Sequence, residues 1–146
     1  MKNQLLGNRS RRGVASFVVA FAVVGILLVD TRPAAAVDLS GCWSGTWESC
    51  TTGHHGPLRG NFTACGENQY QVTFSGRFFK LFPFRYSVTL DVVEDKGDSV
   101  VLSGSSFLGR MFGTFTYSAT ASDGQFNASY SSCKDSGYFR LSKCCQ

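Results

Sequence analysis

The amino-acid sequence predicts an all-β protein: an antiparallel, eight-stranded up-and-down meander closed into a small barrel. From Val37 onward, apolar residues do not recur with the helical period of 3.6, whereas alternation with a period of two is found in nearly every segment. Every alternating segment but one has an apolar and a polar face, and short turn sequences separate the segments. A sandwich of two stacked β-sheets would use the same faces and is the alternative.

The first four predicted strands cover residues 41–50, 58–65, 69–78 and 82–92. In the first of them, both tryptophans of the chain share a face with glycine residues. The fourth strand is the longest, and it places Phe82, Phe84 and Tyr86 on its apolar face. We expect these three aromatic side chains, together with Phe78 at the end of the third strand, to point into the core.

The last four predicted strands cover residues 99–107, 110–120, 125–131 and a segment around 139–141. Residues 99–107 alternate poorly, and Met111 is expected to point inward from the strand that follows them. Strands joined by tight turns are antiparallel neighbours, and closing the meander gives both sheet edges a partner. The turn sequences are Gly66-Glu67-Asn68, Asp95-Lys96-Gly97-Asp98, Ser122-Asp123-Gly124 and Asp135-Ser136-Gly137.

The first two strands suggest a specific register. Pairing Cys42 with Cys65 brings the two thiols side by side on the outward face, where a disulfide can form. The same pairing sets a large residue against a small one at each inward position, which favours close packing. The inward pairs are then Trp43 with Ala64, Gly45 with Phe62 and Trp47 with Gly60.

Residues 1–36 have the layout of an export signal. Lys2, Arg9, Arg11 and Arg12 precede an uncharged apolar run, and Pro33-Ala34-Ala35-Ala36 supplies the small residues that signal peptidase requires. Residues 10–14, Ser-Arg-Arg-Gly-Val, resemble part of the twin-arginine export motif. We therefore expect a bacterial protein whose mature chain begins at Val37, in the periplasm, at the cell surface or secreted. An uncleaved anchor helix is the alternative, although the apolar run is short for a membrane span.

The positive charge of the chain belongs to the predicted signal. Of 14 Lys and Arg and 10 Asp and Glu residues, five cations and one acid lie in residues 1–36, which leaves nine of each sign in the mature chain. A nucleic-acid partner would require a clustered excess of Lys and Arg. The composition therefore gives no support for nucleic-acid binding.

All six cysteines lie in the mature chain, which predicts a single domain (37–146) stapled by disulfides. Zinc is the competing reading, but no Cys-x-x-Cys pair occurs and the histidines are the adjacent His54 and His55, so we expect neither a metal site nor a cofactor. Adjacent cysteines should have different partners, because a disulfide between them is strained. From their positions in the meander, we expect Cys50 to bond Cys133, and Cys42 to bond either Cys65 or Cys144, with Cys145 bonded separately.

The stretch Leu39-Ser40-Gly41-Cys42-Trp43 places a Gly-x-Trp motif at the start of the first strand. With the order of short strands over residues 39–144, it resembles the opening of calycins such as lipocalins and avidin-like proteins. This resemblance implies a ligand cavity inside the barrel and Trp43 packed at the closed end.

An up-and-down meander assigns each connection to one of two ends. The end that we call the basic end carries residues 51–57, 79–81, 108–110 and 135–137, whereas the acidic end carries Glu67, residues 94–98, Asp123 and both termini of the mature chain. Binding residues tend to lie on loops held by a rigid scaffold, so the apolar and cationic basic end is the candidate. The predicted contact residues there are Phe79, Lys80, Leu81, His54, His55, Leu108 and Arg110.

No catalytic set is recognisable, since Gly104-Ser105-Ser106 lacks the Gly-x-Ser-x-Gly elbow and no carboxylate pair is placed by the sequence. We expect an exported, non-enzymatic barrel that binds an apolar small molecule or an envelope protein at its basic end, with the tip at 79–81 able to touch a membrane. A structural domain of the envelope is an equal expectation. The alternative is a small outer-membrane barrel, because alternation does not say whether the apolar face meets the core or lipid.

Overall fold

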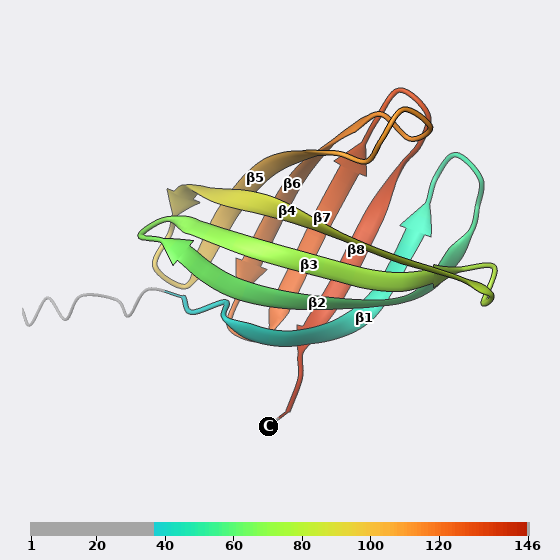
Figure 1. The fold of residues 1–146 in the computed structure, drawn as a ribbon. Coiled ribbons are helices and arrows are strands. Elements are labelled where there is room, and N and C mark those ends of the chain that lie inside the picture. The colour runs from blue at the N-terminus through green and yellow to red at the C-terminus, as the bar shows by residue number, and fades with distance from the viewer. Residues whose placement is uncertain (1–36, 146) are drawn as a thin grey trace, which may run out of the picture. The chain divides into compact units, whose positions relative to one another are not determined.

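The computed structural model describes residues 37–145, and the predicted export signal at 1–36 lies outside this range. The described residues form eight β-strands (Figure 1). No helix in this part of the chain is long and apolar enough to cross a membrane. The strands are β1 (Gly41–Ser49), β2 (His55–Gly66), β3 (Gln69–Phe78), β4 (Phe82–Asp95), β5 (Ser99–Phe107), β6 (Thr114–Ser122), β7 (Gln125–Ser131) and β8 (Ser136–Lys143).

The strands form a closed up-and-down barrel, as predicted, and not a two-sheet sandwich. Each strand pairs in antiparallel fashion with the next one in the sequence. Closure comes from β1 and β8, which pair from Trp43 opposite Lys143 to Ser49 opposite Gly137. The last strand therefore returns to the first, and neither is left as a sheet edge.

The predicted register between β1 and β2 is wrong, although the predicted faces are right. Trp43 lies opposite Gly60 and Trp47 opposite Gly56. β2 begins at His55, earlier than expected, so the β1–β2 loop is short and the pairing shifts by an even number of residues. An even shift keeps every side chain on its face, and it again places a large residue opposite a glycine.

Three residues predicted to point inward are exposed: Ala64, Phe82 and Met111. Ala64 lies near the end of β2, beside a register shift between Ala64 and Gly66. Met111 is 72% exposed because β6 begins only at Thr114, after a loop in which Gly109 and Gly113 have φ of 87° and 77°. Those positive φ values suit glycine and end the extended conformation. Phe82 is 63% exposed because it is the first residue of β4, at the rim of the barrel.

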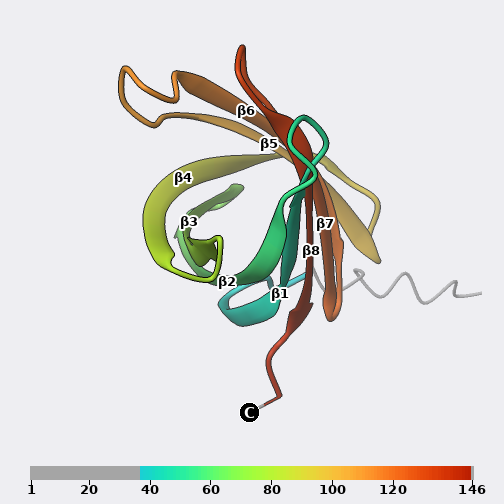
Figure 2. The same cartoon turned by 90° about the vertical axis from the view of Figure 1, so that its right-hand side faces the viewer.

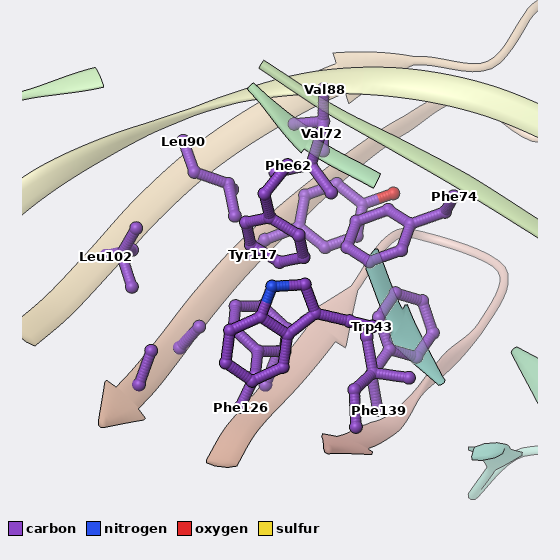
Figure 3. Close-up of a cluster of buried hydrophobic side chains, with 14 of the residues drawn as sticks. Trp43, Phe62, Val72, Phe74, Val88, Leu90, Leu102, Tyr117, Phe126 and Phe139 are labelled. Atoms are coloured by element: carbon purple, nitrogen blue, oxygen red, sulfur yellow. The ribbon is translucent and has the colours of Figure 1, made fainter. Parts of the chain in front are cut away.

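Buried side chains pack around Trp43 inside the barrel (Figure 3). Trp43 is fully buried, with its ring centroid 5.4 Å from that of Phe62 and 6.3 Å from that of Phe126. Its Nε1–H donates to the carbonyl oxygen of Leu39 at 2.8 Å, so the one polar atom of the indole is satisfied. Trp43 thus closes one end of the barrel interior.

The apolar faces of the strands point into the barrel, and the polar faces point out. On β6, for example, Phe115, Tyr117 and Ala119 are buried while Thr116 and Ser118 are exposed. An outer-membrane barrel needs the reverse arrangement, with an apolar band on its outer surface. The distribution of side chains therefore contradicts the membrane-barrel alternative.

A disulfide joins Cys42 at the start of β1 to Cys144 just after β8, with their Cα atoms 5.4 Å apart. This bond settles the choice left open for Cys42: Cys65 is not its partner, because Cys42 lies opposite Asn61 on β2. The predicted bond between Cys50 and Cys133 is not formed in the structure. The cysteines outside the Cys42–Cys144 bond are exposed thiols: Cys50, Cys65, Cys133 and Cys145.

Candidate functional site

A cavity of about 700 Å³ opens at the basic end of the barrel. Its walls are formed mainly by aromatic side chains from β1, β3, β4, β6, β7 and β8, and its rim by the loops of the basic end. Figure 2 views the molecule from this end. The aromatic wall residues include Trp47, Phe78, Phe84, Tyr86, Phe115 and Phe139.

The aromatic residues on one side of the cavity pack against one another. The Trp47 ring lies 4.9 Å from Phe78 and 6.1 Å from Phe84 between centroids, in edge-to-face geometry in both cases. Phe78 and Phe84 are 4.6 Å apart, and Phe84 stacks on Tyr86 at 6.2 Å. Each ring is held by another ring, so this wall is largely formed before any ligand binds.

The barrel wall is incomplete beside the cavity. Pairing between β4 and β5 begins at Thr89 opposite Ser105, so within residues 37–145 the β4 segment 82–88 has no ladder partner on its β5 side. Figure 2 shows β4 diverging from β5 and β6 over this stretch. A side-chain hydrogen bond crosses the gap, from Ser106 Oγ to the carbonyl oxygen of Ser87 at 3.1 Å. Arg85, an exposed residue of this unpaired segment, also lines the cavity, as do residues of the β5–β6 loop.

A chain of hydrogen bonds forms a polar cluster on the opposite side of the rim. Ser49, which is buried, donates from Oγ to Asp135 Oδ1 at 2.6 Å, and the Tyr130 hydroxyl donates to Oδ2 at 3.2 Å. Thr52 Oγ1 donates to Ser49 Oγ at 2.8 Å. The His54 ring nitrogen Nδ1 lies 3.0 Å from Thr52 Oγ1. Asp135 therefore ties the β7–β8 turn to the end of β1 and presents a carboxylate to the cavity.

The tyrosine hydroxyls near the cavity stay protonated at neutral pH. Burial raises the pKa of Tyr130, and the neighbouring Asp135 carboxylate raises it further. Burial also raises the pKa of Tyr86 and of Tyr117. The cavity therefore presents mainly neutral aromatic surface, with Asp135 as the anionic group and Arg85 and Lys134 as the cationic groups on its wall.

The structure brings some of the predicted contact residues together and separates others. Phe79, His54 and Leu108 line the cavity, and the rings of His54 and Phe79 meet edge-to-face at 4.2 Å between centroids. Lys80, Leu81 and Arg110 are exposed on the loops beside it. His55 was expected in the same loop as His54, but it is the first residue of β2 and lies opposite Glu48.

Sequence reasoning missed the polar cluster. Ser49 and Asp135 are separated by 86 residues, so no local pattern links them. The one available signal was the clustering of Asp135 with Ser136 and Gly137, which was interpreted as a turn. Within residues 37–145, no group of three or more His, Cys, Asp or Glu side chains is placed to hold a metal ion.

Comparison of the chain with protein-family models, with curated proteins and with solved structures finds no match.

Proposed function

We propose that this protein is an exported, non-enzymatic barrel that binds an apolar small molecule in the cavity at its basic end. The observation that carries this proposal is an aromatic-walled cavity of about 700 Å³ in a barrel whose other end is packed around Trp43. Ligand sites are typically concave, mostly apolar and of about 300–1,000 Å³, with a few polar groups that fix orientation. A structural domain would gain nothing from leaving so much aromatic surface open to solvent.

The polar cluster restricts the class of ligand. The Asp135 carboxylate accepts hydrogen bonds and faces a cavity whose walls are mainly aromatic. A ligand with an apolar body and a hydrogen-bond donor, such as a hydroxyl or an amine, matches this arrangement. The aromatic rings bury the apolar body of the ligand, and the Asp135 carboxylate accepts a hydrogen bond from its donor group.

Two further features support export and the resemblance to calycins. The Cys42–Cys144 disulfide is consistent with an oxidising compartment outside the cytoplasm. A closed end packed on Trp43, with a cavity at the other end, is the arrangement that the calycin resemblance implies.

Ligand binding can be tested by titrating the protein with N-phenylnaphthylamine, an uncharged apolar probe that fluoresces when buried. We expect one saturable site, with affinity reduced about tenfold or more by Phe84→Ser, because a buried phenylalanine side chain contributes about 1.5–3 kcal/mol. Tyr70→Ser is the matched control, since Tyr70 is also a half-buried aromatic residue but hydrogen-bonds to Val37 near the other end. Absence of saturable binding, or equal weakening by the two substitutions, would favour the structural envelope domain.

A further inference from the structure

Exposed apolar side chains gather on two loops of the basic end. Among residues 37–145, eight large hydrophobic side chains are exposed, and six of them belong to the segments 79–82 and 107–112. These six are between 47% and 75% exposed. A soluble protein rarely leaves so concentrated an apolar patch without a partner. The six are Phe79, Leu81, Phe82, Phe107, Met111 and Phe112.

Positive charge surrounds the same loops. The basic end carries Arg77, Lys80, Arg85, Arg110 and Lys134, with Asp135 as its acid. Within residues 37–145, the ion pairs are Lys96–Glu94 and Arg140–Glu48, so none of these five cations has an acidic partner. The acids gather at the other end of the barrel, at Glu67, Glu94, Asp95, Asp98 and Asp123.

We propose that the segments 79–82 and 107–112 dock the basic end of the barrel on an anionic lipid bilayer. Side chains such as Phe79 and Met111 would enter the boundary between headgroups and acyl chains, and Lys80 and Arg110 would meet the lipid phosphates. The separation of charge between the two ends would orient the barrel as it approaches a negative surface.

A second copy of the chain fits this patch less well than a bilayer. A symmetric head-to-head dimer would place Lys80 and Arg110 of one copy against the same cations of the other. A head-to-tail contact would set the apolar loops against the polar, acidic end. An anionic bilayer satisfies the apolar side chains and the cations together.

The gap in β4–β5 pairing beside the cavity gives this docking a role, which rests on the proposed function. The unpaired β4 segment 82–88 and the β5–β6 loop both contribute residues to the cavity lining, so the two docking segments flank the gap. A molecule with an apolar body could then pass between the bilayer and the cavity without being fully exposed to water. The docking itself does not depend on a ligand.

Vesicle flotation tests the docking with protein exported and purified from cells that express the full chain. We expect it to float with vesicles of phosphatidylcholine and phosphatidylglycerol and to bind phosphatidylcholine vesicles much more weakly. Lys80→Gln with Arg110→Gln should weaken binding about 25-fold, since each cation near an anionic surface contributes about fivefold. Phe79→Ser with Leu81→Ser, and separately Met111→Ser with Phe112→Ser, should each weaken it about tenfold or more.

Matched controls lie at the other end of the barrel. Val93 is 59% exposed, so Val93→Ser removes an exposed apolar side chain, and Lys96→Gln removes a cation; neither should change flotation. The thermal unfolding midpoint of each variant is checked against that of the wild type. Because two separate loop variants are made, the test still holds if one of them fails to fold. Equal binding to both kinds of vesicle, or loop variants that float like the wild type, would overturn the proposal. The proposal would also be overturned if the protein did not float and light scattering showed that these loops drive self-association instead.

The two proposals fail separately. Probe binding in solution without flotation would leave the cavity function standing and remove the docking. Flotation without saturable probe binding would do the opposite.

Discussion

Replacing both Cys42 and Cys144 with serine is expected to lower the free energy of unfolding by about 4–5 kcal/mol. The bond joins residues 102 positions apart, and closing a loop of about 100 residues removes roughly 4.7 kcal/mol of chain entropy from the unfolded state. It also lies beside the β1–β8 seam that closes the barrel, where the Cys144 amide donates to the Cys42 carbonyl oxygen at 2.9 Å. Urea unfolding of the oxidised proteins, followed by tryptophan fluorescence, measures the difference.

Cys65→Ser is the matched control for this experiment, because Cys65 is an exposed thiol outside the Cys42–Cys144 bond. It should change stability by less than about 0.5 kcal/mol. A loss below about 1 kcal/mol in the double variant would show that the bond does not constrain the unfolded chain in the expected way.

Trp43→Ala is expected to cost about 3–5 kcal/mol, a large share of the roughly 5–15 kcal/mol by which a domain of this kind is stable. Trp43 is fully buried between Phe62 and Phe126, and its removal leaves a cavity at the closed end and an unmet carbonyl at Leu39. The measurement is the shift of the urea midpoint at constant slope.

Two substitutions calibrate the Trp43 result. Trp43→Phe keeps most of the apolar volume and should cost less than Trp43→Ala. Tyr138→Ala removes an aromatic side chain that is 45% exposed on β8, and should cost less than about 1 kcal/mol. If Trp43→Ala and Tyr138→Ala were equally mild, Trp43 would not be the residue that packs the closed end.

The fold could be predicted from the sequence because the alternation of side chains between the two faces of a strand is a robust signal. Trp43 and Trp47 lie on the inner face whichever even register β1 adopts, so the faces were right while the register was wrong. The errors at Phe82 and Met111 have one cause: a strand's alternating pattern continues past the point where the barrel has an interior. Hydrophobicity alone does not mark where a rim begins.

The candidate site was predicted by region more than by residue. Assigning loops to two ends placed Phe79, His54 and Leu108 at the correct end, because an up-and-down order fixes which connections share an end. The contact between Ser49 and Asp135 depends on how two distant strand ends meet, which alternation does not encode. The same limit applied to Cys42. Its two candidate partners, Cys65 and Cys144, were both assigned to the acidic end, and only the true register distinguishes them.

The two tryptophans of the chain offer the most direct test of the central claim, that an apolar ligand enters the cavity at the basic end. The Trp47 indole lines that cavity, whereas the Trp43 indole is buried at the closed end and bonded to Leu39. In a ¹H–¹⁵N spectrum, we predict that N-phenylnaphthylamine shifts the Nε1–H resonance of Trp47 as it saturates and leaves that of Trp43 in place. A shift of the Trp43 resonance alone, or of neither, would contradict the claim.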